Sequence, residues 1–107
     1  GQVQGLASAW FSYSLKWNPD LYWSKIKIPV LAINGSLDLQ VTSKENLAGI
    51  KSNLVKAKNK NFEVVEFPSL NHLFQECKTG AISEYGTIEQ TISTTVLDKM
   101  STWILKL

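Results

Sequence analysis

The chain has 107 residues, of which 44% are hydrophobic and 19% are charged. That length suits one small domain, and the composition is that of a folded protein rather than a disordered one. Its 11 basic and 9 acidic side chains leave a net charge of +2, which is too small to indicate binding to nucleic acid or to an anionic membrane.

The sequence also gives no indication of a disulfide, a metal site, a cofactor or a membrane span. Cys77 is the only cysteine, so no disulfide can form within the chain, and one cysteine with one histidine does not make a zinc site. Glycine-rich phosphate-binding motifs are absent, and no apolar run approaches the roughly 20 residues that cross a bilayer. Residues 1–5 lack the layout of a signal peptide, which leaves localisation open.

Residues 1–25 predict a helical, cap-like prefix rich in aromatic side chains. At spacings of three and four residues, one helical face would carry the large side chains Leu6, Trp10, Tyr13 and Trp17. Asn18 suits an N-cap and Pro19 suits the first position of a helix, so a short second helix is expected to run to about Lys25.

The next segment predicts a buried strand. Residues 29–34 form an apolar run without polar alternation, which is typical of a strand buried on both faces in a parallel sheet. Gly35 then lets the chain turn into a loop over residues 36–41.

A helix is predicted over residues 43–58. Thr42 and Glu45 fit a capping box at its start. Leu47, Ile50 and Leu54 then lie on one helical face, which predicts that this face packs against the sheet.

A second strand and a last helix complete the predicted unit. Residues 62–67 are rich in β-branched and aromatic side chains, Pro68 ends the strand, and a long loop follows. The last helix begins after the hydroxyl-rich residues 91–95. Its predicted buried stripe consists of Val96, Leu97, Met100, Trp103, Ile104 and Leu107.

The predicted fold is therefore α/β, as a single domain over residues 1–107. Residues 26–107 form a βαβα unit with two parallel strands, and residues 1–25 form the prefix. Parallel sheets usually have both faces covered and contain more than two strands. We therefore predict that the unit is a part of a larger sheet, and that its exposed sheet edge favours self-association.

Two polar residues follow the carboxyl ends of the two predicted strands, where functional residues of open α/β sheets lie. Asp38 follows the first strand and its glycine, and His72 follows the second. Neighbouring parallel strands are about 4.8 Å apart, so the two side chains could form a hydrogen bond. A carboxylate on one ring nitrogen would let the other nitrogen accept a proton from a hydroxyl nucleophile. Each residue alone could equally be an ordinary loop residue.

The segments around these residues resemble the α/β-hydrolase superfamily, most closely its esterase-like and dienelactone-hydrolase-like members. Ile28–Asp38 is similar to the family's "PVL…GxxD" strand and acid turn, and Pro68–Phe74 is similar to its histidine loop. The resemblance extends from about Asn18 onward, and Ser83–Gly86 and Ile88–Ser93 are similar to the subgroup's ending. It implies that Asp38 is the catalytic acid and His72 the general base and acid.

The family's nucleophile motif, G-x-S-x-G, does not occur in the chain. Gly5-Leu6-Ala7-Ser8-Ala9 lacks the closing glycine. The resemblance therefore implies the C-terminal portion of a serine hydrolase that acts on small-molecule acyl esters, with its serine upstream and with no activity in this chain alone.

Two alternatives stay open. Asp20 or Glu66 could be the carboxylate partner instead of Asp38, although Asp20 precedes the first strand and Glu66 lies within the second. The chain could also be a non-catalytic α/β module for interaction or self-association, in which Asp38 and His72 are ordinary loop residues.

Overall fold

The computed structural model describes residues 17–107, so the predicted helical face at Leu6, Trp10 and Tyr13 lies outside the described residues. The strands β1 (Val30–Gly35) and β2 (Phe62–Phe67) pair in parallel, with Val30 opposite Phe62. The prediction of a small α/β fold with two parallel strands and flanking helices is confirmed. The elements in chain order are α2 (Asp20–Trp23), β1 (Val30–Gly35), α3 (Ser43–Lys56), β2 (Phe62–Phe67), the 3-10 helix η1 (Ile82–Thr87) and α4 (Thr94–Leu105).

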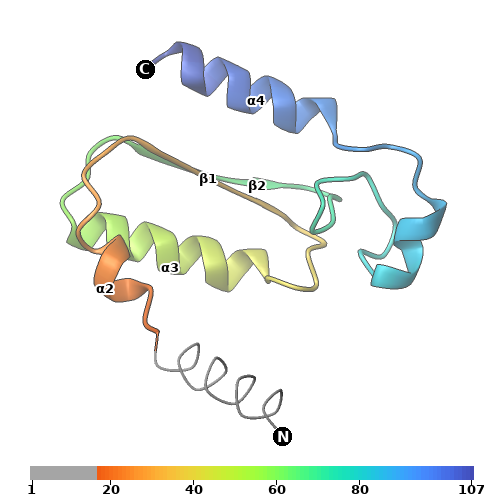
Figure 1. Cartoon of the computed structure of the whole chain (residues 1–107), viewed down its shortest axis with the longest axis horizontal. Helices are drawn as coiled ribbons and strands as arrows, with labels where there is room; N and C mark the ends of the chain where they lie inside the picture. The colour runs from red at the N-terminus through yellow and green to blue at the C-terminus, as the bar shows by residue number, and fades with distance from the viewer. Residues whose placement is uncertain (1–16) are drawn as a thin grey trace, which may run out of the picture.

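The two strands lie between two helices, with α3 on one side and α4 on the other (Figure 1). Leu47 and Leu54 of α3 are buried, and Leu54 has no exposed surface. On the side of α4, the buried core consists of Phe67, Leu70 and Val96. Partly buried side chains packed against this core are Ile33, Val65, Phe74 and Ile92.

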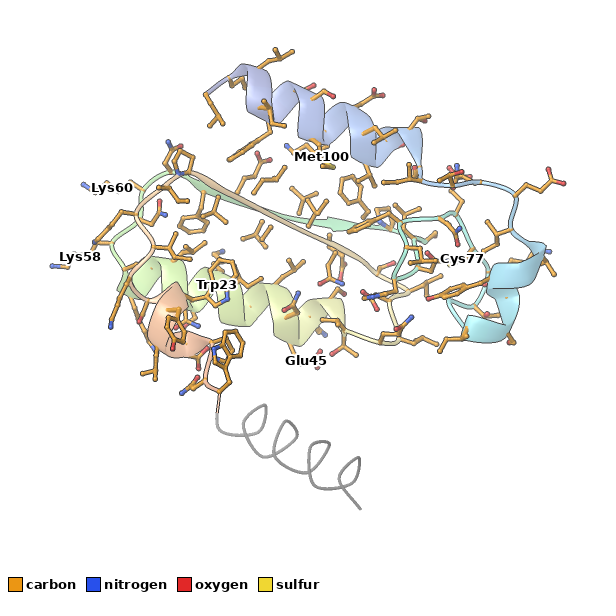
Figure 2. The ribbon with its side chains drawn as sticks, in the orientation of Figure 1. Trp23, Glu45, Lys58, Lys60, Cys77 and Met100 are labelled. Carbon is orange, nitrogen blue, oxygen red and sulfur yellow. The ribbon has the colours of Figure 1, made fainter. Side chains whose placement is uncertain are left out.

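The apolar face of α4 is only partly covered, which corrects the prediction of a buried stripe. Val96 is buried, but Leu97, Met100, Ile104 and Leu107 are exposed within the described part of the chain. Figure 2 places Met100 on the side of α4 that faces the strands. The physical reason is that a sheet of two strands is too narrow to cover a helix face of three turns.

The burial of β1 differs from the prediction for the same reason. Ala32 and Asn34 are buried, whereas Leu31 and Ile33, which line a groove with α4, are only partly buried. The burial on both faces that the apolar pattern of β1 predicts is therefore incomplete in residues 17–107.

The helix ends differ in detail from the capping predictions. Thr42 is the N-cap of α3, but its side chain makes no capping hydrogen bond, so the predicted capping box is incomplete. Pro19 rather than Asn18 is the N-cap of α2, and Asn18 Oδ1 instead accepts a hydrogen bond from the Asp20 N–H at 3.0 Å. Trp17 is half exposed and stacks on Tyr22, with 5.8 Å between the ring centroids. None of the helices in residues 17–107 has the length and apolar character needed to cross a membrane.

Candidate functional site

The carboxylate of Asp38 is buried and accepts four hydrogen bonds. Asp38 follows the carboxyl end of β1 and is 7% exposed. Its Oδ1 accepts the backbone N–H groups of Gln40 at 3.0 Å and Val41 at 2.8 Å. Its Oδ2 accepts the Asn34 side-chain amide at 3.1 Å and His72 Nδ1 at 2.9 Å. Every lone pair of the carboxylate therefore has a donor.

These hydrogen bonds keep Asp38 ionised. Burial raises the pKa of its carboxyl, but the hydrogen bonds from Val41, His72 and Gln40 outweigh burial, and the pKa is lowered from its ordinary value of 3.8. An anionic Asp38 can only accept hydrogen bonds, so a neutral His72 carries its proton on Nδ1.

His72 presents its other ring nitrogen away from Asp38. It lies in the loop after β2, and its side chain is 37% exposed. Within residues 17–107, the imidazole ring makes a single hydrogen bond, which joins Nδ1 to Asp38, and no described group bonds to Nε2. An imidazole held by a carboxylate on Nδ1 with a lone pair on Nε2 can accept a proton from a hydroxyl group.

The loops that carry Asp38 and His72 cross in direct backbone contact at one end of the sheet (Figure 1). The Ser36 N–H donates to Phe67 O at 2.8 Å, and the Leu37 N–H donates to Leu70 O at 2.9 Å. A Cβ atom on Gly35 would lie 2.3 Å from Leu70 O, closer than real Cβ contacts come. Glycine at position 35 therefore allows the histidine loop to lie against the end of β1.

Asn71 organises the histidine loop from inside. Its side chain is fully buried, and its Oδ1 accepts the N–H groups of Leu73 at 2.9 Å and Gln75 at 3.0 Å. Its amide group donates to Gln75 Oε1 at 3.0 Å, and the Gln75 amide group in turn donates to Gln90 O at 2.9 Å. These contacts fix the loop on both sides of His72.

Glu84 of η1 binds residues 78–80, which lie against the loop that carries Asp38 (residues 36–41, the acid loop). Its carboxylate accepts the backbone N–H groups of Lys78 at 2.9 Å and of Thr79 and Gly80 at 3.1 Å, and these bonds, led by that of Lys78, lower the pKa of Glu84. Gly80 has a φ of 79°. A Cβ atom there would lie 2.0 Å from Leu37 O, so this glycine also permits a close contact with the acid loop.

Tyr85 of η1 reaches the residues next to Asp38. Its hydroxyl oxygen accepts a hydrogen bond from Gln40 Nε2 at 2.8 Å. A cavity of about 630 Å³ lies along the same segment, lined by residues that include Cys77, Glu84 and Gln90 but neither Asp38 nor His72. The 3-10 helix therefore borders the Asp38–His72 pair without being part of it.

The two alternative carboxylates lie apart from His72. Asp20 Oδ1 accepts the side-chain amide of Asn53 at 2.7 Å, which joins α2 to α3. Glu66 accepts a hydrogen bond from the Ser43 hydroxyl group. Asp38 is thus the carboxylate that the structure brings to His72.

The structure also places three polar residues at the site that the sequence did not reveal, namely Asn34, Asn71 and Gln75. The signal that could have found Asn34 is a polar side chain at the end of an otherwise apolar strand.

In residues 17–107, no group of three or more His, Cys, Asp or Glu side chains is placed to hold a metal ion. Comparisons of the chain with protein-family models, with curated proteins and with solved structures found no match.

The contact at Gly35 predicts a large difference between two glycine substitutions. Gly35→Ala should lower the free energy of unfolding by roughly 1–3 kcal/mol, because the new methyl group overlaps backbone oxygens that cannot move freely. Gly49→Ala is the matched control: nothing lies within 4 Å of its Cβ position, and alanine in a helix should raise stability by about 1 kcal/mol. Urea unfolding of both variants measures the difference. Equal effects would contradict the close contact.

The lowered pKa of Asp38 predicts acid sensitivity. Because the pKa is lower in the folded chain, ionised Asp38 stabilises the fold above the ordinary pKa, and this stabilisation is lost as the pH falls through the lowered pKa. Between about pH 5 and pH 2, the free energy of unfolding should therefore fall more steeply in the wild type than in Asp38→Asn. Asp98→Asn removes an exposed carboxyl of α4 and serves as the control. Parallel curves for wild type and Asp38→Asn would show that the hydrogen bonds do not favour the ionised form.

Proposed function

We propose that this chain is the C-terminal portion of a serine hydrolase with an α/β-hydrolase fold, acting on carboxylic esters or related acyl compounds. The observation that carries the proposal is the 2.9 Å contact between His72 Nδ1 and a buried, ionised Asp38 at the carboxyl ends of adjacent parallel strands. The order Asp and then His along the chain agrees with that of α/β-hydrolases, in which the serine precedes both.

In the proposed reaction, a serine upstream of this chain attacks the acyl carbon. His72 Nε2 accepts the serine proton and passes it to the leaving group, while Asp38 stabilises the imidazolium that forms. Water, activated by the same nitrogen, then releases the acyl group and restores the serine. Asp38 and His72 are the catalytic residues of this chain in the proposal, and the chain alone is inactive because it lacks the nucleophile.

The free edge of β1 supports a larger sheet around this unit. The Val30 N–H donates to Asn61 O at 3.1 Å and the Ser36 N–H donates to Phe67 O at 2.8 Å, so these groups point toward β2. Along a strand these directions alternate, so the N–H groups of Leu31, Ile33 and Gly35 point away from β2. No strand of residues 17–107 pairs with that edge. In the proposal, an upstream strand that precedes the acid strand occupies it.

The same surface favours a second candidate function, that of a non-catalytic α/β interaction or self-association module. An apolar groove of about 360 Å³ lies beside the free edge, between β1 and the α4 residues Met100, Trp103 and Ile104. An unpaired strand next to exposed apolar side chains can recruit another chain. If His72 and Asp38 have no catalytic role, binding at this surface is the function that the structure favours.

Labelling with a fluorophosphonate tests the hydrolase proposal. The reagent is applied to the full-length natural product that contains this segment, and the labelled peptide is identified by mass spectrometry. We expect a labelled serine in an upstream G-x-S-x-G peptide, and we expect His72→Ala to slow labelling and ester turnover by several orders of magnitude. Asp20→Asn, which alters a carboxylate remote from His72, should leave both rates near those of the wild type. The absence of labelling in a folded natural product would contradict the hydrolase proposal and favour the interaction module.

Self-association of this chain is a separate expectation from the free edge and the groove. At high concentration, sedimentation should give a mass above that of the 12.0 kDa monomer. Ile104→Lys, which places a charge in the groove, should shift the chain toward the monomer. Ile82→Lys is the matched control, because Ile82 is 68% exposed and lies on η1, outside the groove. A monomeric wild type at high concentration would contradict this expectation.

A further inference from the structure

Asn34 is a buried polar side chain in a strand whose pattern calls for an apolar residue. It is 3% exposed and follows four apolar residues of β1. A buried amide lowers stability unless its hydrogen bonds are made, so an aliphatic side chain would fit this position at least as well in a purely structural role. The bonds that Asn34 makes therefore indicate what the residue contributes.

Those bonds lead from α3 to the carboxylate of Asp38. Asn46 Nδ2, on α3, donates to Asn34 Oδ1 at 2.6 Å. The Asn34 amide group then donates to Asp38 Oδ2 and to Val41 O, both at 3.1 Å. The oxygen that accepts from Asn34 is the same one that contacts His72.

The donation from Asn46 sets the orientation of the Asn34 amide. Because Asn46 presents an N–H to the Asn34 oxygen, the NH₂ group of Asn34 faces Asp38. The reversed amide would place an oxygen against the Asp38 carboxylate, where two acceptors repel each other. Since the two backbone N–H groups at Gln40 and Val41 hold only Oδ1, the amide of Asn34 is the second donor that fixes Oδ2.

From this geometry we infer that Asn46 and Asn34 form a positioning relay, which holds Asp38 Oδ2 in place and thereby keeps His72 in the Nδ1–H form with Nε2 free to accept a proton. The catalytic purpose of the relay rests on the proposed function. Neither asparagine touches the reacting atoms, so both are positioning residues. The two hydrogen bonds that link Asn46 to Asn34 and Asn34 to Asp38 both donate in the direction of Asp38, and bonds in such a chain strengthen one another.

The test uses the single histidine of the chain, because its ring ¹⁵N signals belong to His72 alone. Nitrogen NMR of the full 107-residue chain, at a pH where His72 is neutral, gives the ratio of the Nδ1–H to the Nε2–H form. We expect Asn46→Asp to reverse the Asn34 amide and to lower this ratio by about threefold to tenfold, the effect of about one hydrogen bond. Asn34→Leu, which removes the donor at similar volume, should lower the ratio in the same direction.

Asn53→Asp is the matched control. Asn53 lies on the same helix and donates to a carboxylate, Asp20 Oδ1, at 2.7 Å, but it lies about two helical turns along α3 from Asn46. It should weaken α3 without changing the ratio of the two ring forms. An unchanged ratio in Asn46→Asp and Asn34→Leu, or an equal change in Asn53→Asp, would overturn the relay.

The same variants in the full-length natural product separate this inference from the proposed function. A slower fluorophosphonate labelling by about threefold to tenfold in Asn46→Asp, with Asn53→Asp unchanged, supports both. Labelling that occurs but does not respond to the relay variants overturns the catalytic purpose of the relay and leaves the hydrolase standing. An altered ring ratio in a protein that is never labelled overturns the hydrolase and supports the positioning of His72 by the relay.

Discussion

The crossing of two backbones at the end of the sheet is the constraint on which the rest of the site depends. Because Gly35 has no side chain, the histidine loop can lie against β1, and the Leu37 N–H can donate to Leu70 O. This contact brings two loops from different strands within reach of one hydrogen bond, between Asp38 and His72. The parallel pairing of the strands places both loops at the same end of the sheet. The absence of a side chain at Gly35 then lets the two backbones come into contact.

A second layer of order comes from buried amides. Asn34 donates a hydrogen bond to the Asp38 carboxylate, and Asn71 accepts backbone hydrogen bonds within the turn that carries His72. Both side chains are almost fully buried, and within residues 17–107 no buried side-chain nitrogen or oxygen lacks a hydrogen-bond partner. Such satisfied networks restrict the conformations of the groups they contain, which is the requirement of a site whose geometry must exist before a ligand arrives.

Sequence patterns predict the parts of this structure that depend on neighbours along the chain. The apolar run of β1 and the spacing of Leu47 and Leu54 in α3 are local signals, and the parallel order of the strands then places Asp38 near His72. The roles of Asn34 and Asn46 depend on a contact between a strand and a helix. The residue type alone does not show whether an asparagine is buried in such a contact or exposed to solvent. The pattern of α4 identifies its apolar face, but coverage of that face depends on how many strands lie beneath it.

The chain on both sides of His72 contacts the segment around Asp38, and this arrangement limits how the chain length can vary. Leu70 contacts Gly35, and ten residues later Gly80 contacts Leu37, with His72 between the two contacts. An inserted or deleted residue between these contacts would move the imidazole or break one of them. Next to Gly86, by contrast, nothing lies within 4 Å of the Cβ position, so extra residues there have room to form a bulge in solvent. Length variation among proteins built on this plan should therefore gather after Glu84 rather than around His72.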